Sequence, residues 1–205
     1  MILIALAVSI LLLFLASAQV FIVSAALYFA DLQEASIERP ENTWLDAAEF
    51  LSYSNPDVFV VRAKFLRQKA LLPEFKNQRS EILNEALSNL VLAVEQRPLW
   101  PYYRLSEFNI LVLLDAEPTV VQSKVGEILL LAPNERGLDK HFLELAFHSW
   151  DKLSLEQRQW MVKRLAIVPG DTFNYVFSVA KSLNRQAVIC TNLPYKKIKK
   201  MCKAR

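Results

Sequence analysis

The chain has little glycine. Only Gly126, Gly137 and Gly170 occur among its 205 residues. Sheet-rich proteins use glycine in their tight turns, so this shortage disfavours an all-β fold. It also leaves no glycine-rich loop of the kind that binds nucleotide phosphates, because such loops need closely spaced glycines. We therefore expect an all-α protein without a standard nucleotide-binding motif.

Side chains suited to catalysis or metal binding are scarce as well. The two histidines, His141 and His148, lie seven residues apart, and neither belongs to an H-E-x-x-H motif. The nearest acidic pair, Asp115 and Glu117, falls at an expected helix end, where a solvated cap is the simpler interpretation. We expect no catalytic residue, no metal site and no cofactor, and therefore a protein that is not an enzyme.

Charge is absent from the first thirty residues, which are almost entirely apolar. A helix of this length, at about 1.5 Å per residue, exceeds the roughly 30 Å hydrocarbon core of a bilayer. We expect residues 1–30 to form a transmembrane signal anchor. Cleavage after Ala18, at the Ala16-Ser17-Ala18 sequence, is the alternative. Retention is favoured because no basic residue precedes the run and a second apolar stretch follows Ala18.

The segment after this run carries acidic residues and only one arginine. Asp31, Glu34, Glu38 and Glu41 accompany Arg39. Because basic residues tend to stay on the cytoplasmic side, this flank favours an extracytoplasmic body behind a short internal N-terminus. We interpret residues 31–54 as a linker with a short helix.

Three prolines in the rest of the chain recur with a regular period. Pro98, Pro133 and Pro169 are separated by 35 and 36 residues, and each follows an apolar segment of helical periodicity. This period is typical of helical-hairpin repeats and resembles the tetratricopeptide family, in which a proline closes the second helix of a repeat of about 34 residues. We expect residues 55–192 to form a tetratricopeptide-like (TPR-like) stack of helical hairpins.

The first of these repeats fits the tetratricopeptide pattern best. Ala86 and Ala93 occupy its two small-residue positions, and Tyr102 occupies an aromatic position in the next helix. Later repeats depart from the pattern, so helix packing of the standard close kind is not expected there. Their first small position holds Val121 and Gln157, and their second holds Ile128 and Arg164.

Aromatic residues gather where the second expected repeat begins. They are Trp100, Tyr102, Tyr103 and Phe108. Aromatic rings stack on sugars, but aromatic residues at repeat junctions also belong to the hydrophobic core. Both interpretations remain open.

Residues 98–161 show a closer resemblance to one protein family. The region opens with Trp-Pro-Tyr-Tyr at 100–103, has an Ala-Pro-Asn-Glu break at 132–135, and continues with Ser-Trp-Asp-Lys-Leu at 149–153. In these motifs it resembles the VpsP family of bacterial exopolysaccharide biosynthesis proteins. The resemblance implies one N-terminal membrane helix, a small repeat-like helical domain, and a role in polysaccharide assembly or export at the inner membrane. It implies no enzymatic activity.

The only two cysteines are Cys190 and Cys202. Their spacing suits a disulfide-closed loop, and disulfides persist in oxidising compartments. If the body is extracytoplasmic, we expect them to be bonded. Free thiols on a cytosolic face are the alternative.

Basic residues are concentrated at the C-terminus. We interpret residues 193–205 as a basic tail that binds anionic headgroups or an acidic polymer, or that is simply a solvated end. Nucleic acid is not an expected partner, because the tail has no interleaved stacking aromatics. The residues are Lys196, Lys197, Lys199, Lys200, Lys203 and Arg205.

Two functions remain at this point. The first is a single-pass inner-membrane adaptor, with a periplasmic helical-repeat domain that binds proteins of a polysaccharide polymerase or export complex. The alternative is a protein of the same pathway that binds or modifies glycan directly.

Overall fold

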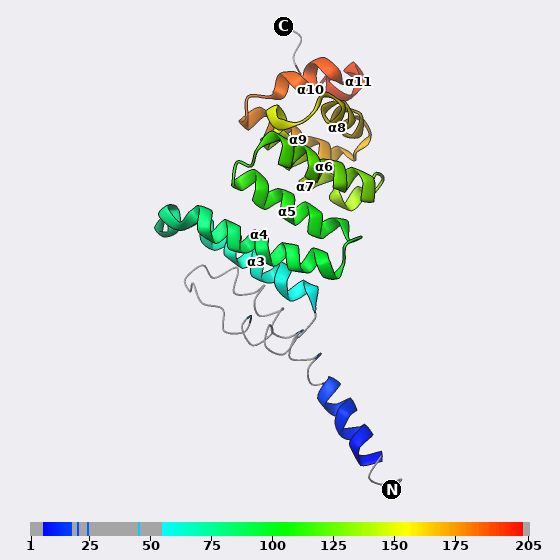
Figure 1. The fold of residues 1–205 in the computed structure, drawn as a ribbon. Coiled ribbons are helices and arrows are strands. Elements are labelled where there is room, and N and C mark those ends of the chain that lie inside the picture. The colour runs from blue at the N-terminus through cyan, green and yellow to red at the C-terminus, as the bar shows by residue number, and fades with distance from the viewer. Residues whose placement is uncertain (1–5, 18–19, 21–23, 25–44, 46–54, 203–205) are drawn as a thin grey trace. The chain divides into compact units, whose positions relative to one another are not determined.

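The computed structural model describes residues 6–17, 20, 24, 45 and 55–202, and all regular structure among them is helical (Figure 1). The predicted all-α fold class is therefore confirmed for these residues. Within the described residues, no helix combines the length and the apolar character needed to span a bilayer. Parts of the expected anchor at 1–30, and all of the expected linker at 31–54 except residue 45, lie outside the described residues.

The chain divides into two compact units, Met1–Pro98 and Leu99–Arg205. In the first unit, α3 (Pro56–Leu71) and α4 (Arg79–Gln96) pack against each other as a hairpin joined by the 3₁₀ helix η1 (Pro73–Gln78). The start of α3 is set by Asn55, whose side chain accepts a hydrogen bond of 3.1 Å from the Asp57 amide.

Buried alanines occur in both of these helices. Ala63 of α3 and Ala86 and Ala93 of α4 are buried, together with Leu83 and Leu90. Small side chains allow two helix backbones to approach closely, because little volume separates them. The two small positions expected from the sequence are thus fully buried.

The second unit is a succession of short helices. Two 3₁₀ helices, η2 (Arg136–Leu138) and η3 (Trp150–Lys152), lie in the connections before and after α7. The α-helices are α5 (Pro101–Leu113), α6 (Pro118–Leu131), α7 (Asp139–His148), α8 (Leu155–Ile167), α9 (Gly170–Ser182), α10 (Gln186–Asn192) and α11 (Tyr195–Ile198).

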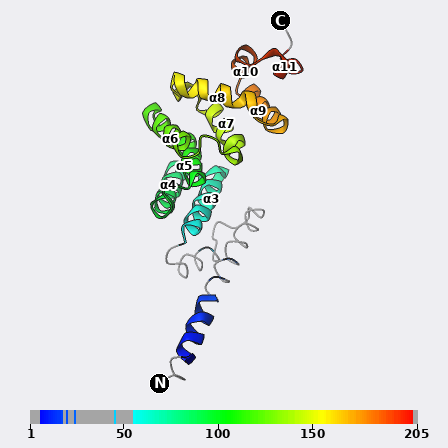
Figure 2. The same ribbon diagram turned by 90° about the vertical axis from the view of Figure 1, so that its right-hand side faces the viewer.

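Helices of this unit contact both their neighbours and the next helix but one (Figure 2). α5 packs against α6 and α7, α7 packs against α8 and α9, and α6 also contacts α8. α9 in turn packs against α10. Consecutive helices therefore form hairpins, and corresponding helices of successive hairpins lie side by side.

The three periodic prolines lie just after alternate helices. α4 ends at Gln96, α6 at Leu131 and α8 at Ile167, so each helix ends two residues before Pro98, Pro133 or Pro169. Proline lacks the amide that would continue the helix, and it restricts the preceding residue to extended conformations. The proline period therefore coincides with the ends of the second helices of the hairpins.

A single hydrophobic core runs through the second unit. Phe108 of α5 contacts Phe142 of α7 edge to face, with ring centroids 6.1 Å apart, and Phe147 stacks on Trp150 at 5.2 Å. The same core extends to Leu193 and, beyond it, Ile198. The C-terminal segment from residue 193 is therefore folded onto the unit as far as Cys202.

Candidate functional site

The four candidate aromatic residues separate into two pairs. Tyr103 and Phe108 are buried in the core, with 3% and 0% of their surfaces exposed. Trp100 and Tyr102 are 48% and 38% exposed, and their ring centroids lie 5.5 Å apart. Only Trp100 and Tyr102 are accessible to a partner, and we call this pair the aromatic corner.

The hydroxyl of Tyr102 faces the connection between α6 and α7. It donates a hydrogen bond of 3.4 Å to Oε1 of Glu135, which also accepts one of 2.9 Å from the Gly137 amide. A Cβ atom at residue 137 would collide with this hydroxyl, so the contact requires glycine there. Burial and the Glu135 carboxylate raise the pKa of Tyr102.

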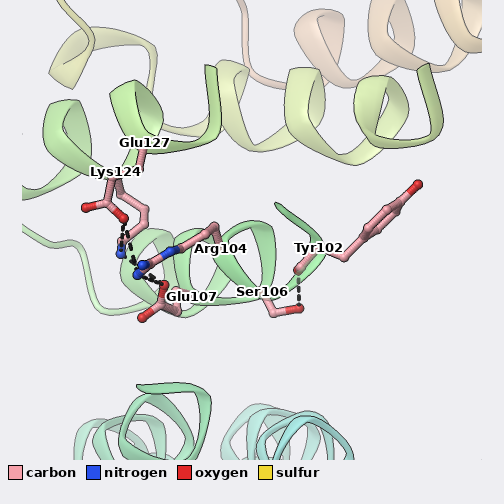
Figure 3. A network of polar contacts seen from close by, with 6 residues as sticks. All are labelled: Tyr102, Arg104, Ser106, Glu107, Lys124 and Glu127. Atoms are coloured by element: carbon pink, nitrogen blue, oxygen red, sulfur yellow. Dashed lines mark hydrogen bonds and ion pairs between the residues drawn. The ribbon is translucent and has the colours of Figure 1, made fainter. Parts of the chain in front are cut away.

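Four charged side chains form a network between α5 and α6 (Figure 3). Nζ of Lys124 lies 2.9 Å from Oε2 of Glu107 and 2.9 Å from Oε2 of Glu127. Arg104 completes the network, at 3.2 Å from Glu107 and 3.3 Å from Glu127. The Glu107 carboxylate is almost fully buried.

This network is balanced in charge, with two cations contacting two carboxylates. A buried carboxylate is tolerated only when cations and hydrogen bonds compensate its lost hydration, and Glu107 obtains both from Arg104 and Lys124. We interpret the network as a set of ion pairs that holds α5 and α6, the two helices of one hairpin, together. Sequence reasoning missed it, although both helices carry a basic residue three positions before a glutamate, Arg104 to Glu107 and Lys124 to Glu127.

A second buried ion pair occupies one of the expected small positions. Nε of Arg164 in α8 donates a hydrogen bond of 2.6 Å to Oδ1 of Asp139 at the start of α7, and both side chains are less than one tenth exposed. In its repeat, Arg164 occupies the position that Ala93 holds in the first hairpin. The charge of Arg164 is thus used inside the fold.

The other polar small position, Gln157, joins two hairpins. Its side-chain Nε2 donates a hydrogen bond of 2.7 Å to the backbone carbonyl of Gln122 in α6. Its backbone amide donates one of 3.2 Å to Oγ of Ser154. The Gln122 side chain in turn donates to the Lys152 carbonyl at 2.9 Å. Hydrogen bonds here replace the close contact of small side chains.

The acidic pair and the histidines make separate contacts. Asp115 follows α5 with a left-handed backbone (φ 55°) and pairs with Lys152, while Glu117 precedes α6. His141 is exposed and lies 3.4 Å from Glu144, and His148 is also exposed. Within residues 55–202, no group of His, Cys, Asp or Glu side chains is arranged to hold a metal ion.

The cysteines form a disulfide between α10 and the end of the described chain. Cys190 and Cys202 are bonded, with their Cα atoms 5.7 Å apart, as the sequence predicts. Lys197, inside the loop that they close, donates hydrogen bonds of 2.8 and 2.9 Å to the Ala166 and Val168 carbonyls at the end of α8. One lysine of the basic segment therefore caps a helix. Lys196, Lys199 and Lys200 are exposed, and Lys203 and Arg205 lie outside the described residues.

Comparison of the chain with models of protein families, with curated proteins and with solved structures gives no match. Its function must therefore be inferred from its own sequence and structure.

Proposed function

We propose that this protein is a membrane-anchored periplasmic adaptor in bacterial exopolysaccharide assembly or export. The observation that supports the proposal best is the succession of hairpins in which α5, α7 and α9 lie side by side and α6 contacts α8. In repeat proteins such stacking creates an extended surface that binds other proteins. We propose that the stack is TPR-like, with Pro98, Pro133 and Pro169 closing its repeats.

The anchor and its orientation belong to the same proposal. The uncharged run at residues 1–30 is long enough to span the inner membrane once. The Cys190–Cys202 disulfide supports an oxidising compartment for the body. A phosphatase fused after Arg205 should be active, because that reporter folds only outside the cytoplasm. Activity of a cytoplasmic-type reporter alone at the same position would contradict this orientation.

The VpsP-like motifs are the reason for proposing a role in exopolysaccharide assembly or export. They lie at the start of α5, between α6 and α7, and between α7 and α8, which are the places where helices are joined. Deletion of the protein should reduce surface polysaccharide, and pull-down from detergent should return subunits of a polymerase or export complex. Normal polysaccharide in the deletion strain would contradict the assigned pathway.

A non-enzymatic role predicts the effect of four substitutions. Replacing Asp115, Glu117, His141 or His148 singly by Ala should leave the polysaccharide yield near wild type, because within residues 55–202 no group of His, Cys, Asp or Glu side chains is arranged to hold a metal ion. Loss of yield with normal abundance of the variant would reveal a catalytic or metal-binding role.

Direct glycan binding is the second candidate, and the exposure of the aromatic corner favours it. Trp100 and Tyr102 present partly open rings beside Glu135, a carboxylate that accepts hydrogen bonds. Sugars bind proteins through such stacking and acceptor groups. In titrations of the purified full chain with the exopolysaccharide, Trp100→Ala should weaken binding, whereas Trp160→Phe, a change inside the folded unit, should not. No binding by the wild type would remove this candidate.

A further inference from the structure

Acidic residues are absent from the last part of the chain. All 21 Asp and Glu residues lie at or before Asp171, whereas eight Lys and Arg residues follow it. This segment contains all of α9 beyond its first turn, together with α10 and α11. This segment therefore carries no acidic residue of its own, and its Arg185 pairs with Asp151, which lies outside the segment.

The fold holds this basic segment in place. The Cys190–Cys202 disulfide closes it, Ile198 is buried in the core, and Lys197 caps the end of α8 through two backbone carbonyls. Three other lysines of this segment take no part in these contacts. Lys196, Lys199 and Lys200 are exposed, and within the described residues none of them has an ion-pair partner. We call these three lysines the basic face.

Apolar side chains are exposed in the same region. Tyr195, directly before the basic face, is 70% exposed. Ile167 is 69% exposed, and it lies between Ala166 and Val168, whose carbonyls accept the hydrogen bonds from Lys197. Lysines beside an exposed tyrosine and an aliphatic side chain are typical of surfaces that lie at the headgroup boundary of a bilayer.

We propose that the basic face binds the anionic lipid headgroups of the membrane in which the chain is anchored. This inference rests on the anchor of the proposed function, because a tether keeps the body near the bilayer and makes a weak contact effective. A lysine at an anionic surface strengthens binding about five-fold, so three lysines give on the order of a hundred-fold. Exposed Tyr195 and Ile167 favour lipid over an acidic polysaccharide, because the boundary between headgroups and acyl chains also accepts apolar side chains.

The test uses the full chain reconstituted in lipid nanodiscs. One set contains only zwitterionic phosphatidylcholine, and the other contains one third phosphatidylglycerol. Lysines are methylated with formaldehyde and borane, which are small and uncharged, and the rate at each lysine is read by mass spectrometry. Lys181 of α9, exposed and in the same acid-free segment, serves as the internal reference.

We expect methylation at Lys196, Lys199 and Lys200 to be at least three-fold slower in the anionic discs than in the neutral discs, relative to Lys181. The protection should disappear at 1 M salt, where charges are screened within about 3 Å. In the wild type, the anionic discs should also slow hydrogen exchange at the Tyr195 backbone amide, and high salt should remove this protection. The variant Lys196→Glu/Lys199→Glu/Lys200→Glu should lack the protection. The control Lys181→Glu should retain it. An intact disulfide and unchanged melting temperature show that these variants are folded.

Equal rates in the two kinds of disc would overturn the lipid contact and leave the anchor intact. Protection that appears only when an acidic polysaccharide is added to neutral discs would also overturn it, and would assign the basic face to polymer. A chain that enters neither disc would contradict the anchor, and with it both proposals.

Discussion

The α3–α4 hairpin of the first unit and the α7–α8 hairpin of the second unit use different side chains at corresponding positions. In α4 these positions hold the buried alanines Ala86 and Ala93. In α8 they hold Gln157, which donates to the Gln122 carbonyl, and Arg164, which pairs with Asp139. These positions are therefore filled by small apolar side chains in α4 and by side chains with specific polar contacts in α8. At these positions, we expect an increase in volume to damage α4 and the loss of a polar partner to damage α8.

The largest effect is expected from breaking the buried pair. Arg164→Ala leaves the Asp139 carboxylate buried without a cation, which costs about 3–5 kcal/mol of the free energy of unfolding. The measurement is denaturant unfolding of the full chain in detergent. The double variant Arg164→Leu/Asp139→Leu should lose less, because neither charge remains buried. A single variant that loses under about 1 kcal/mol would show that the pair is not needed.

The next largest effect on stability is expected from removing the Cys190–Cys202 disulfide. Cys190→Ser/Cys202→Ser should lower stability by about 2–3 kcal/mol, because a loop of this length is no longer restricted in the unfolded chain. The melting temperature of the full chain gives the readout, and reduced wild type is the matched control. Labelling of two thiols per chain, in unreduced and denatured protein from its native compartment, would refute the bond.

A volume change tests the alanine contact of the first unit. Ala93→Leu adds three carbons at a fully buried position of α4 and should destabilise by about 1–3 kcal/mol. Val91→Leu, on an exposed position of the same helix, is the control and should have little effect. If both substitutions are neutral in denaturant unfolding, the packing around α4 does not depend on the small size of Ala93.

The smallest effect is a pH dependence in the second unit. Burial, with a hydrogen bond to Glu144, raises the pKa of Tyr175 to about 12 from its model-peptide value of 10.0. Its protonated hydroxyl therefore stabilises the fold below pH 10, and this contribution is lost as pH rises from 10 through about 12. Unfolding followed across this window should be less steep in pH for Tyr175→Phe than for wild type. An identical pH slope would show that Tyr175 titrates as it does in the unfolded chain.

Helix positions were predictable because their signals are local. Low glycine content, apolar periodicity and the prolines at 98, 133 and 169 indicated short helices and their ends before any contact was known. The disulfide was predictable for a similar reason, since Cys190 and Cys202 are close in sequence and have no other possible partner. The sequence did not show which of the four aromatic candidates are buried, because adjacent residues on a helix, such as Tyr102 and Tyr103, face different surroundings.

By itself, the sequence determined the all-helical class, the hairpin period and the cysteine pair, because each depends on backbone chemistry or on residues near one another in the chain. Only the tertiary structure decided what the charges do. Glu107 and Lys124 are 17 residues apart and Arg164 and Asp139 are 25 apart, so their pairing depends on which helix faces lie together. It also decided that Lys197 caps α8 while its neighbours remain exposed, because burial is set by packing across the fold and not by residue type.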